Sequence, residues 1–296
     1  MDINTRRNLE LTESMRTKEK KGSLLWVLDK TETAAGARML RAWVERPLLS
    51  PSAIRARQGA VEELCGDFML RQQIAELLSG VLDLERLVTR AVYGTANAKD
   101  LRAISNTAAI LPELRGLLSV CKSDKLRAIC EEMDPLTDVC KRVSDAIRED
   151  PPFSLREGGI IADGYDRDVD HLRSVMKDGK GWIEKIAEEE REVTGIKTLK
   201  VNYNKVFGYY IEVTKSLIDQ VPDRYIRKQT LSNCERYITQ ELKDMEATVL
   251  GAADRICALE YELFQEIRNF VAEQSARIQR TASLLAELDA YLSLAT

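Results

Sequence analysis

The 296-residue chain contains few turn-forming residues, with only 15 glycines and 7 prolines. Because these residues interrupt regular structure, their scarcity favours long helices. No run of about eighteen apolar residues is present and the first residues are polar, so the sequence predicts neither a transmembrane span nor a signal peptide. We therefore expect a soluble, intracellular protein that does not contact a membrane.

The sequence also offers little for catalysis. His171 is the only histidine, so every triad that needs one would have to use it. Neither GxxxxGK[ST] nor GxGxxG occurs, which excludes the common phosphate-binding loops. Residues 166–170 resemble the start of a calcium loop, but His171 and Lys177 stand where that loop needs glycine and glutamate. We interpret residues 166–170 as a solvated helix start, residues 188–190 as a solvated acidic face, and expect no catalytic, metal or cofactor site.

Apolar residues recur at helical spacing over most of the first half of the chain. Ser23 and the pair Ser50-Pro51 are typical N-terminal signals of helices, and Pro112 is interpreted as the end of one. The predicted helices cover about 23–28, 33–45, 50–65, 67–79, 83–94, 98–111, 123–133 and 135–149.

The second half predicts two much longer helices, at about 164–193 and 241–275, each with an apolar stripe. The first stripe runs from Val169 to Val193. Segments rich in Val, Ile and Tyr lie between the helices and predict strands at 198–203 and 207–214, with a possible third at 225–230. The expected fold is mainly α, with long antiparallel helices and a small α/β domain inserted at their tip.

The charge is unevenly distributed. The net charge is −4, which argues against a chain that coats nucleic acid with its whole surface. Residues 196–236, however, carry eight basic and four acidic side chains, a net charge of +4, which leaves −8 for the rest. A basic segment on an acidic body is typical of local contact with a polyanion.

Two predicted turns within this basic segment carry polar side chains suited to phosphate oxygens. Asn204 and Lys205 lie in the first turn, and Ser232 and Asn233 in the second. Ordinary turn chemistry is the alternative, because Asn and Ser also favour turns through local backbone bonds. We expect the tyrosines of the segment to pack the small sheet rather than stack on bases; they are Tyr203, Tyr209, Tyr210 and Tyr225.

The stretches LKVNYNKVFGYYIEVTK at 199–215 and YIRKQTLSNCERYITQELKDME at 225–246 resemble the clamp region of the MutS family of DNA mismatch-repair ATPases. Further colinear similarity covers TRRNLEL at 5–11, SLLWVLDKTETAAGARMLRAWVERPL at 23–48 and LDLERLVTRAVYGTANAKDLRAI at 82–104. GGIIADGYDRDVDHLR at 158–173 and ASLLAELDAYLSLA at 282–295 extend it to nearly the whole chain, as in the helical core, or lever, that the clamp interrupts.

The resemblance implies a division into lever residues 1–178, a clamp at 179–240 and lever residues 241–296. It implies that the chain is a fragment of a longer protein whose mismatch-recognition and ATPase domains, with ATP and Mg, lie elsewhere. The implied partners are duplex DNA, a second copy of the protein and a repair factor of the MutL type, in the bacterial cytoplasm.

By the same resemblance, Asn204 corresponds to a clamp asparagine that touches the DNA backbone, and Leu231, Ser232 and Asn233 to the second clamp turn. Ser232 replaces a lysine of some members, which implies a weaker contact there. The predicted DNA-binding set is completed by basic residues near these turns, namely Lys200, Lys205, Arg227 and Lys228. Two alternatives stay open: a module whose basic tip binds an acidic protein, and an enzyme with an unrecognised site.

Overall fold

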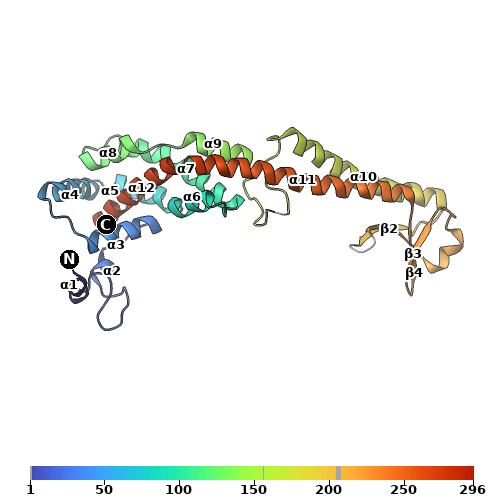
Figure 1. The fold of residues 1–296 in the computed structure, drawn as a ribbon, viewed down its shortest axis with the longest axis horizontal. Coiled ribbons are helices and arrows are strands. Elements are labelled where there is room, and N and C mark those ends of the chain that lie inside the picture. Colours follow the sequence, from blue (N-terminus) through green and yellow to red (C-terminus); the bar gives the residue numbers. More distant parts are fainter. Residues whose placement is uncertain (1, 156, 205–207) are drawn as a thin grey trace. The chain divides into compact units, whose positions relative to one another are not determined.

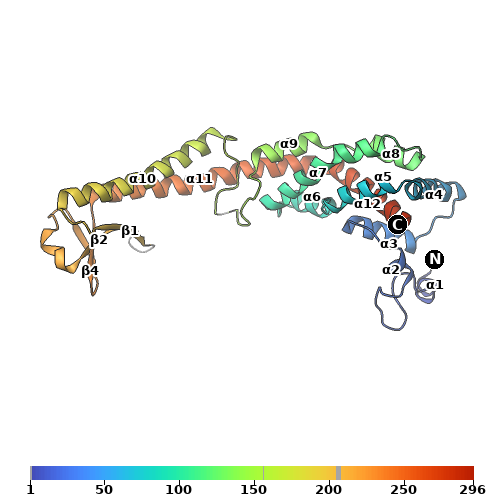
Figure 2. The same ribbon diagram turned by 180° about the vertical axis from the view of Figure 1, so that it is seen from behind.

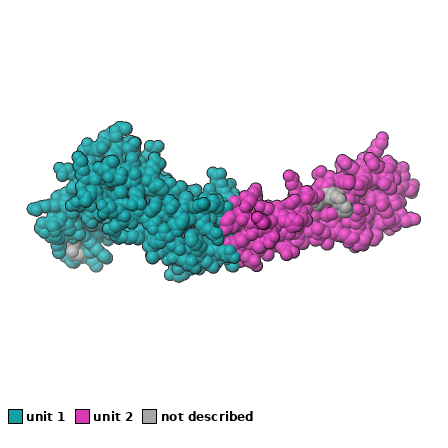
Figure 3. Space-filling model, turned by 90° about the horizontal axis from the view of Figure 1, so that it is seen from above, with its two compact units in different colours: residues 1–155, 264–296 teal, residues 156–263 magenta. Residues whose placement is uncertain are grey.

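A computed structural model describes residues 2–155, 157–204 and 208–296 of the chain, without the side chains of residues 179, 180 and 182. The chain forms two compact units (Figure 3). Unit 1 comprises Met1–Leu155 and Phe264–Thr296, and unit 2 comprises Arg156–Leu263. Among the described residues, no helix is both long and apolar enough to span a membrane.

Unit 1 is a bundle of helices that pack around the last one, α12 (Figures 1 and 2). Its described helices are α1 (Ile3–Asn8), α2 (Leu24–Leu28), α3 (Ala34–Glu45), α4 (Pro51–Gly66), α5 (Phe68–Ser79), α6 (Leu84–Val92), α7 (Ala98–Leu118), α8 (Asp124–Glu132), α9 (Thr137–Ala146) and α12 (Ser275–Ala295). Buried side chains occur on every side of α12, as expected for a helix at the centre of a core. The helices α3, α4, α5, α6 and α8 all contact it.

Two buried polar residues of α12 fasten the segment that enters α3. The carboxylate of Asp289 accepts hydrogen bonds from the backbone N–H groups of Glu32 and Thr33, at 2.9 and 2.8 Å, and from the Thr33 hydroxyl at 2.6 Å. Burial raises the pKa of Asp289, while these bonds oppose the rise. One turn later, the Ser293 hydroxyl accepts from the Lys30 N–H. The start of α3 is therefore fixed by α12 as well as by its own N-cap.

Local signals in the sequence place the beginnings of the helices well. The hydroxyls of Ser23 and Ser50 accept from backbone N–H groups in the first turns of α2 and α4, and Pro51 occupies the first turn of α4. The prediction that a helix ends at Pro112 is wrong, because α7 continues to Leu118. Pro112 is exposed while Leu111, Leu114 and Leu118 are fully buried, so packing of this stripe outweighs the backbone hydrogen bond that proline removes.

Unit 2 contains α10 (Arg167–Thr194) and the first part of α11 (Gln240–Glu273), which run antiparallel side by side in both ribbon views (Figures 1 and 2). Asp166 caps α10 by accepting from two backbone N–H groups, as the interpretation of residues 166–170 predicts. The predicted stripe of α10 is buried at Val169. Its last member, Val193, is 70% exposed, because it lies in the final turn of α10, beyond Ile186, the α10 residue that packs into the sheet core.

A buried ion pair ties the two long helices together near the start of α10. Glu260 of α11 is fully buried and accepts from Arg173 of α10 and, at 3.0 Å, from the backbone N–H of Ile160. Arg173 also donates to the Ile161 carbonyl at 2.7 Å. A buried carboxylate needs such partners, so this cluster holds α10, α11 and the preceding loop in one arrangement.

A four-stranded antiparallel sheet connects the end of α10 to the start of α11. Its strands are β1 (Lys200–Asn204), β2 (Gly208–Thr214), β3 (Ile226–Thr230) and β4 (Cys234–Ile238), in the order β1-β2-β4-β3, and a 3-10 helix, η1 (Lys215–Gln220), follows β2. The mainly α fold with a small α/β insertion is thus confirmed. Four described elements lie outside the predicted set: α1, η1, β4 and α12.

Candidate nucleic-acid interface

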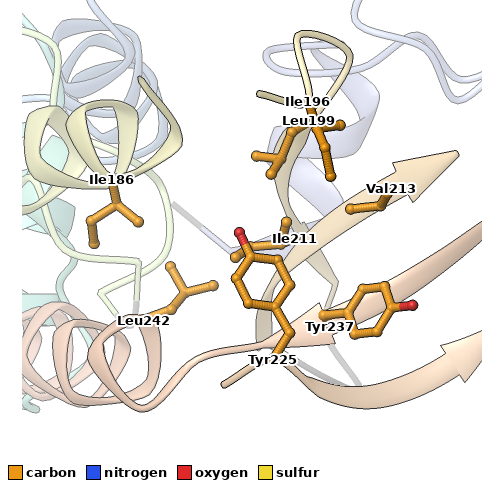
Figure 4. Close-up of a cluster of buried hydrophobic side chains, with 8 residues drawn as sticks. All are labelled: Ile186, Ile196, Leu199, Ile211, Val213, Tyr225, Tyr237 and Leu242. Carbon is orange, nitrogen blue, oxygen red and sulfur yellow. The ribbon is translucent and has the colours of Figure 1, made fainter. Parts of the chain in front are cut away.

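One face of the sheet forms the core that attaches it to the long helices. Alternation along the strands places Val201, Ile211, Val213 and Tyr237 on this face. They belong to a cluster that includes Ile186 of α10 and Leu242 of α11 (Figure 4). The opposite face carries the alternate residues of β1, namely Lys200, Asn202 and Asn204. Lys200 and Asn204 of the predicted set therefore share one face of one strand.

Three of the four tyrosines that are expected to pack the sheet do so. Tyr210 and Tyr225 are buried and Tyr209 packs against the core cluster. Tyr203 is 49% exposed and packs against Tyr209, with ring centroids 5.0 Å apart and the ring planes tilted by 57°. The guanidinium of Arg236 lies 4.4 Å from the ring centroid of Tyr210, which helps to cover that ring on the polar face.

The predicted polar residues lie at two opposite ends of the sheet. At the first, Asn204 is the register partner of Gly208, the first residue of β2. At the second, Thr214, the last residue of β2, pairs with Cys234, directly after the exposed Ser232 and Asn233. Since β2 is seven residues long, the ends are about 20 Å apart at about 3.3 Å per residue. Lys205 lies outside the described residues.

Ion pairs divide the basic residues of the sheet into two groups. Arg224 pairs with Glu190 at 2.6 Å, Arg227 with Glu235 at 3.4 Å and Arg236 with Glu212 at 3.4 Å. Four exposed lysines have no carboxylate partner within the part of the chain that the structure describes; they are Lys197, Lys200, Lys215 and Lys228. Within the described sheet, these lysines are therefore the basic side chains that no carboxylate pairs with, while the arginines also link parts of the sheet to one another and to α10.

The local position of each lysine differs. Lys228 lies at an irregularity in the pairing of β3 with β4, between Arg227 and Gln229, where an extra residue bends the strand. Lys200 lines a groove of about 320 Å³ between β1 and α10. Glu184 and Glu188 line the same groove, so Lys200 has acidic neighbours as well as solvent.

The interpretation of residues 188–190 as a solvated face is wrong for Glu190, which is only 4% exposed. Its carboxylate accepts from Arg224 at 2.6 Å and from the Tyr225 hydroxyl at 2.8 Å. Burial, followed by the bond to Glu190, raises the pKa of Tyr225. Glu190 thus anchors the entry to β3 on α10. Spacing along α10 could not reveal this role, because its partners lie more than thirty residues further on.

The observed arrangement is that of a helical domain with a small basic sheet packed at the ends of two long helices (Figures 1 and 2). The family model described as MutS domain III matches residues 4–295 of the chain. Over the whole chain, 53% of residues are identical to the DNA mismatch repair protein MutS of Acetivibrio thermocellus and 52% to that of Ruminiclostridium cellulolyticum, covering 34% of each relative. The MutS protein of Lachnoclostridium phytofermentans is 51% identical, with 32% of its length covered.

The chain belongs to the MutS family and corresponds to its domain III, as the resemblance predicts. It spans about a third of the length of the relatives that it matches.

Proposed function

We propose that this chain is the lever and clamp region of a DNA mismatch repair protein and that its sheet holds the backbone of duplex DNA without reading base sequence. The observation that carries the proposal is the group of exposed, unpaired lysines on the sheet of a MutS family member. Lysines and side-chain amides contact phosphate oxygens, which position a protein on DNA without specifying sequence. The proposed contact residues are Lys200, Asn204, Lys205, Arg227, Lys228, Ser232 and Asn233.

In this proposal the two long helices transmit conformational changes between DNA and an ATPase domain outside the chain. A stiff element with fixed ends can convey a rotation over tens of ångströms. The buried carboxylates Glu190 and Glu260 support the role, because each fastens one end of α10 to its neighbours. The functional division is into residues 1–178, 179–240 and 241–296.

The proposal extends to the whole protein. Mismatch recognition and ATP hydrolysis with Mg take place outside this chain, and the chain itself has no catalytic role. The full-length protein works in the bacterial cytoplasm as a homodimer and hands the repair signal to a factor of the MutL type. Membership of the family supports these assignments.

A titration of fluorescent homoduplex DNA with the full-length protein tests the clamp. Asn204→Ala combined with Asn233→Ala removes two neutral hydrogen bonds, which should cost about 2 kcal/mol, or roughly thirtyfold in Kd. The matched control is Asn106→Ala with Asn269→Ala, which truncates two exposed helical asparagines of unit 1 and should leave Kd unchanged.

Equal affinities of the clamp variant and its control would contradict the proposal. In that case a titration with poly-glutamate would address the second candidate, a basic sheet that binds an acidic protein. The net charge of +4 over residues 196–236 is the observation that favours this second candidate.

A further inference from the structure

The Asn233 end of the sheet brings together residues that are far apart in the sequence. The hydroxyls of Thr198 and Thr214 are 3.2 Å apart, which places the start of β1 beside the end of β2. The Lys215 N–H donates to the Asn233 carbonyl at 3.1 Å, which places the end of β2 beside the connection between β3 and β4. Lys197 therefore lies on the same edge as these residues. We call Lys197, Lys215, Ser232 and Asn233 the lysine edge.

All four residues of the lysine edge are exposed. Both carboxylates of the described strands are engaged by arginines. Glu235 accepts from the Tyr237 hydroxyl at 2.5 Å and pairs with Arg227, and Glu212 pairs with Arg236. The bond from Tyr237, together with Arg227, lowers the pKa of Glu235, so this carboxylate stays charged and bound to its partners at neutral pH. Neither of these carboxylates is therefore paired with Lys197 or Lys215, and both lysines can contact a ligand.

The spacing of the lysine edge suits a phosphate backbone. Neighbouring strands are about 4.8 Å apart, and β2 separates β1 from β4, so the strands that Lys197 and Asn233 lead into are about 10 Å apart across the edge. Successive phosphates of one DNA strand rise about 3.4 Å along the helix axis. Because the strand also winds around that axis, neighbouring phosphates are further apart than this rise, and the edge can span about two of them with two cations and the neutral donors of Ser232 and Asn233.

We propose that the lysine edge is the main charged contact of the sheet with nucleic-acid phosphates and that Lys197 and Lys215 bind them directly. The proposal rests on the proposed function and adds two residues to its contact set. Lys215 compensates for the uncharged Ser232, since its backbone is bonded to the residue that follows Ser232. Lys200 lies outside the lysine edge, in a groove that Glu184, Glu188 and Arg191 also line.

The test is the salt dependence of duplex binding by the full-length protein. Each phosphate contact made by a lysine contributes about −0.9 to the slope of log K against log salt. Lys197→Gln with Lys215→Gln should therefore make the slope shallower by about 1.8 for each clamp engaged, so the ratio of affinities at 50 and 200 mM salt should fall about twelvefold. Lys177→Gln with Lys185→Gln removes the same charge from α10, outside the lysine edge, and should change the slope much less.

A slope equal to that of the α10 control would overturn the lysine edge. If Asn204→Ala with Asn233→Ala still weakened binding in that case, only the further inference would fail. If neither the asparagine nor the lysine variant differed from its control, the proposed function would fail with it.

Discussion

Gly36 of α3 packs so closely against α12 that an added methyl group should destabilise the fold. A Cβ atom at Gly36 would lie 2.0 Å from Oδ2 of Asp289 and 2.7 Å from its Cβ. Asp289 cannot move away without losing the hydrogen bonds that it accepts from Glu32 and Thr33. Gly36→Ala must therefore either push α3 away from α12 or displace the carboxylate from its donors.

The expected change in the free energy of unfolding is the sum of one stabilising and two destabilising contributions. Alanine is favoured over glycine inside a helix by about 1 kcal/mol. Overpacking a dense core costs about 1–3 kcal/mol. Losing one hydrogen bond to a charged group costs about 1.5–3 kcal/mol more. With one bond lost, Gly36→Ala should lower the free energy of unfolding by about 3 kcal/mol.

Urea denaturation followed by tryptophan fluorescence measures this change, because Trp26 and Trp43 both lie in unit 1. Gly59→Ala and Gly116→Ala are matched controls, since both glycines lie in helices and have no atom within 4 Å of an added Cβ. Both controls should be as stable as the original chain or up to about 1 kcal/mol more stable. The reasoning about α3 and α12 would be refuted if Gly36→Ala behaved like these controls.

Two further substitutions test the account of unit 1. Arg277 donates to Asp134 and Asp138 and thereby lowers the pKa of both carboxyls. A carboxyl with a lowered folded pKa stabilises the fold above its unfolded pKa of about 4, and that contribution is lost as the pH falls through the folded value. Arg277→Gln should therefore reduce the loss of stability below about pH 4. The change should be at most about 1 kcal/mol, because both ion pairs are partly exposed. An unchanged pH profile of stability would argue against a role for these pairs. Pro112→Ala should stabilise α7 by about 1–2 kcal/mol in urea denaturation, since it restores a backbone donor within the helix, and a loss of stability would contradict this view of α7.

Much of the fold could be predicted because its signals are local. Ser23, Ser50 and Asp166 lie next to the apolar periodicity that they cap, so a short window of sequence contains both the start and the body of each helix. Pro112 was the misleading local signal, because the burial of Leu111 and Leu114 depends on helices elsewhere in unit 1. The sequence does not predict strand β4, because it is short and is defined by its pairing with β2 and β3.

The candidate site was predictable only as a set of residues. Composition indicated that residues 196–236 are basic, but it could not show which charges are free. The pairing of Arg224 with Glu190 joins positions 34 residues apart, and that of Arg236 with Glu212 joins positions 24 apart. The separation of Asn204 from Asn233 likewise depends on strand register, which the turn residues do not encode.

The central claim is that the sheet of unit 2 touches duplex DNA, and site-specific photo-cross-linking tests it most directly. A photoreactive residue would replace Ser232 in the full-length protein, and in a matched protein it would replace Tyr93, which is 78% exposed in unit 1. With both proteins bound to labelled homoduplex DNA, the account predicts cross-links from position 232 and few from position 93. Efficient cross-linking from position 93 with none from position 232 would contradict it.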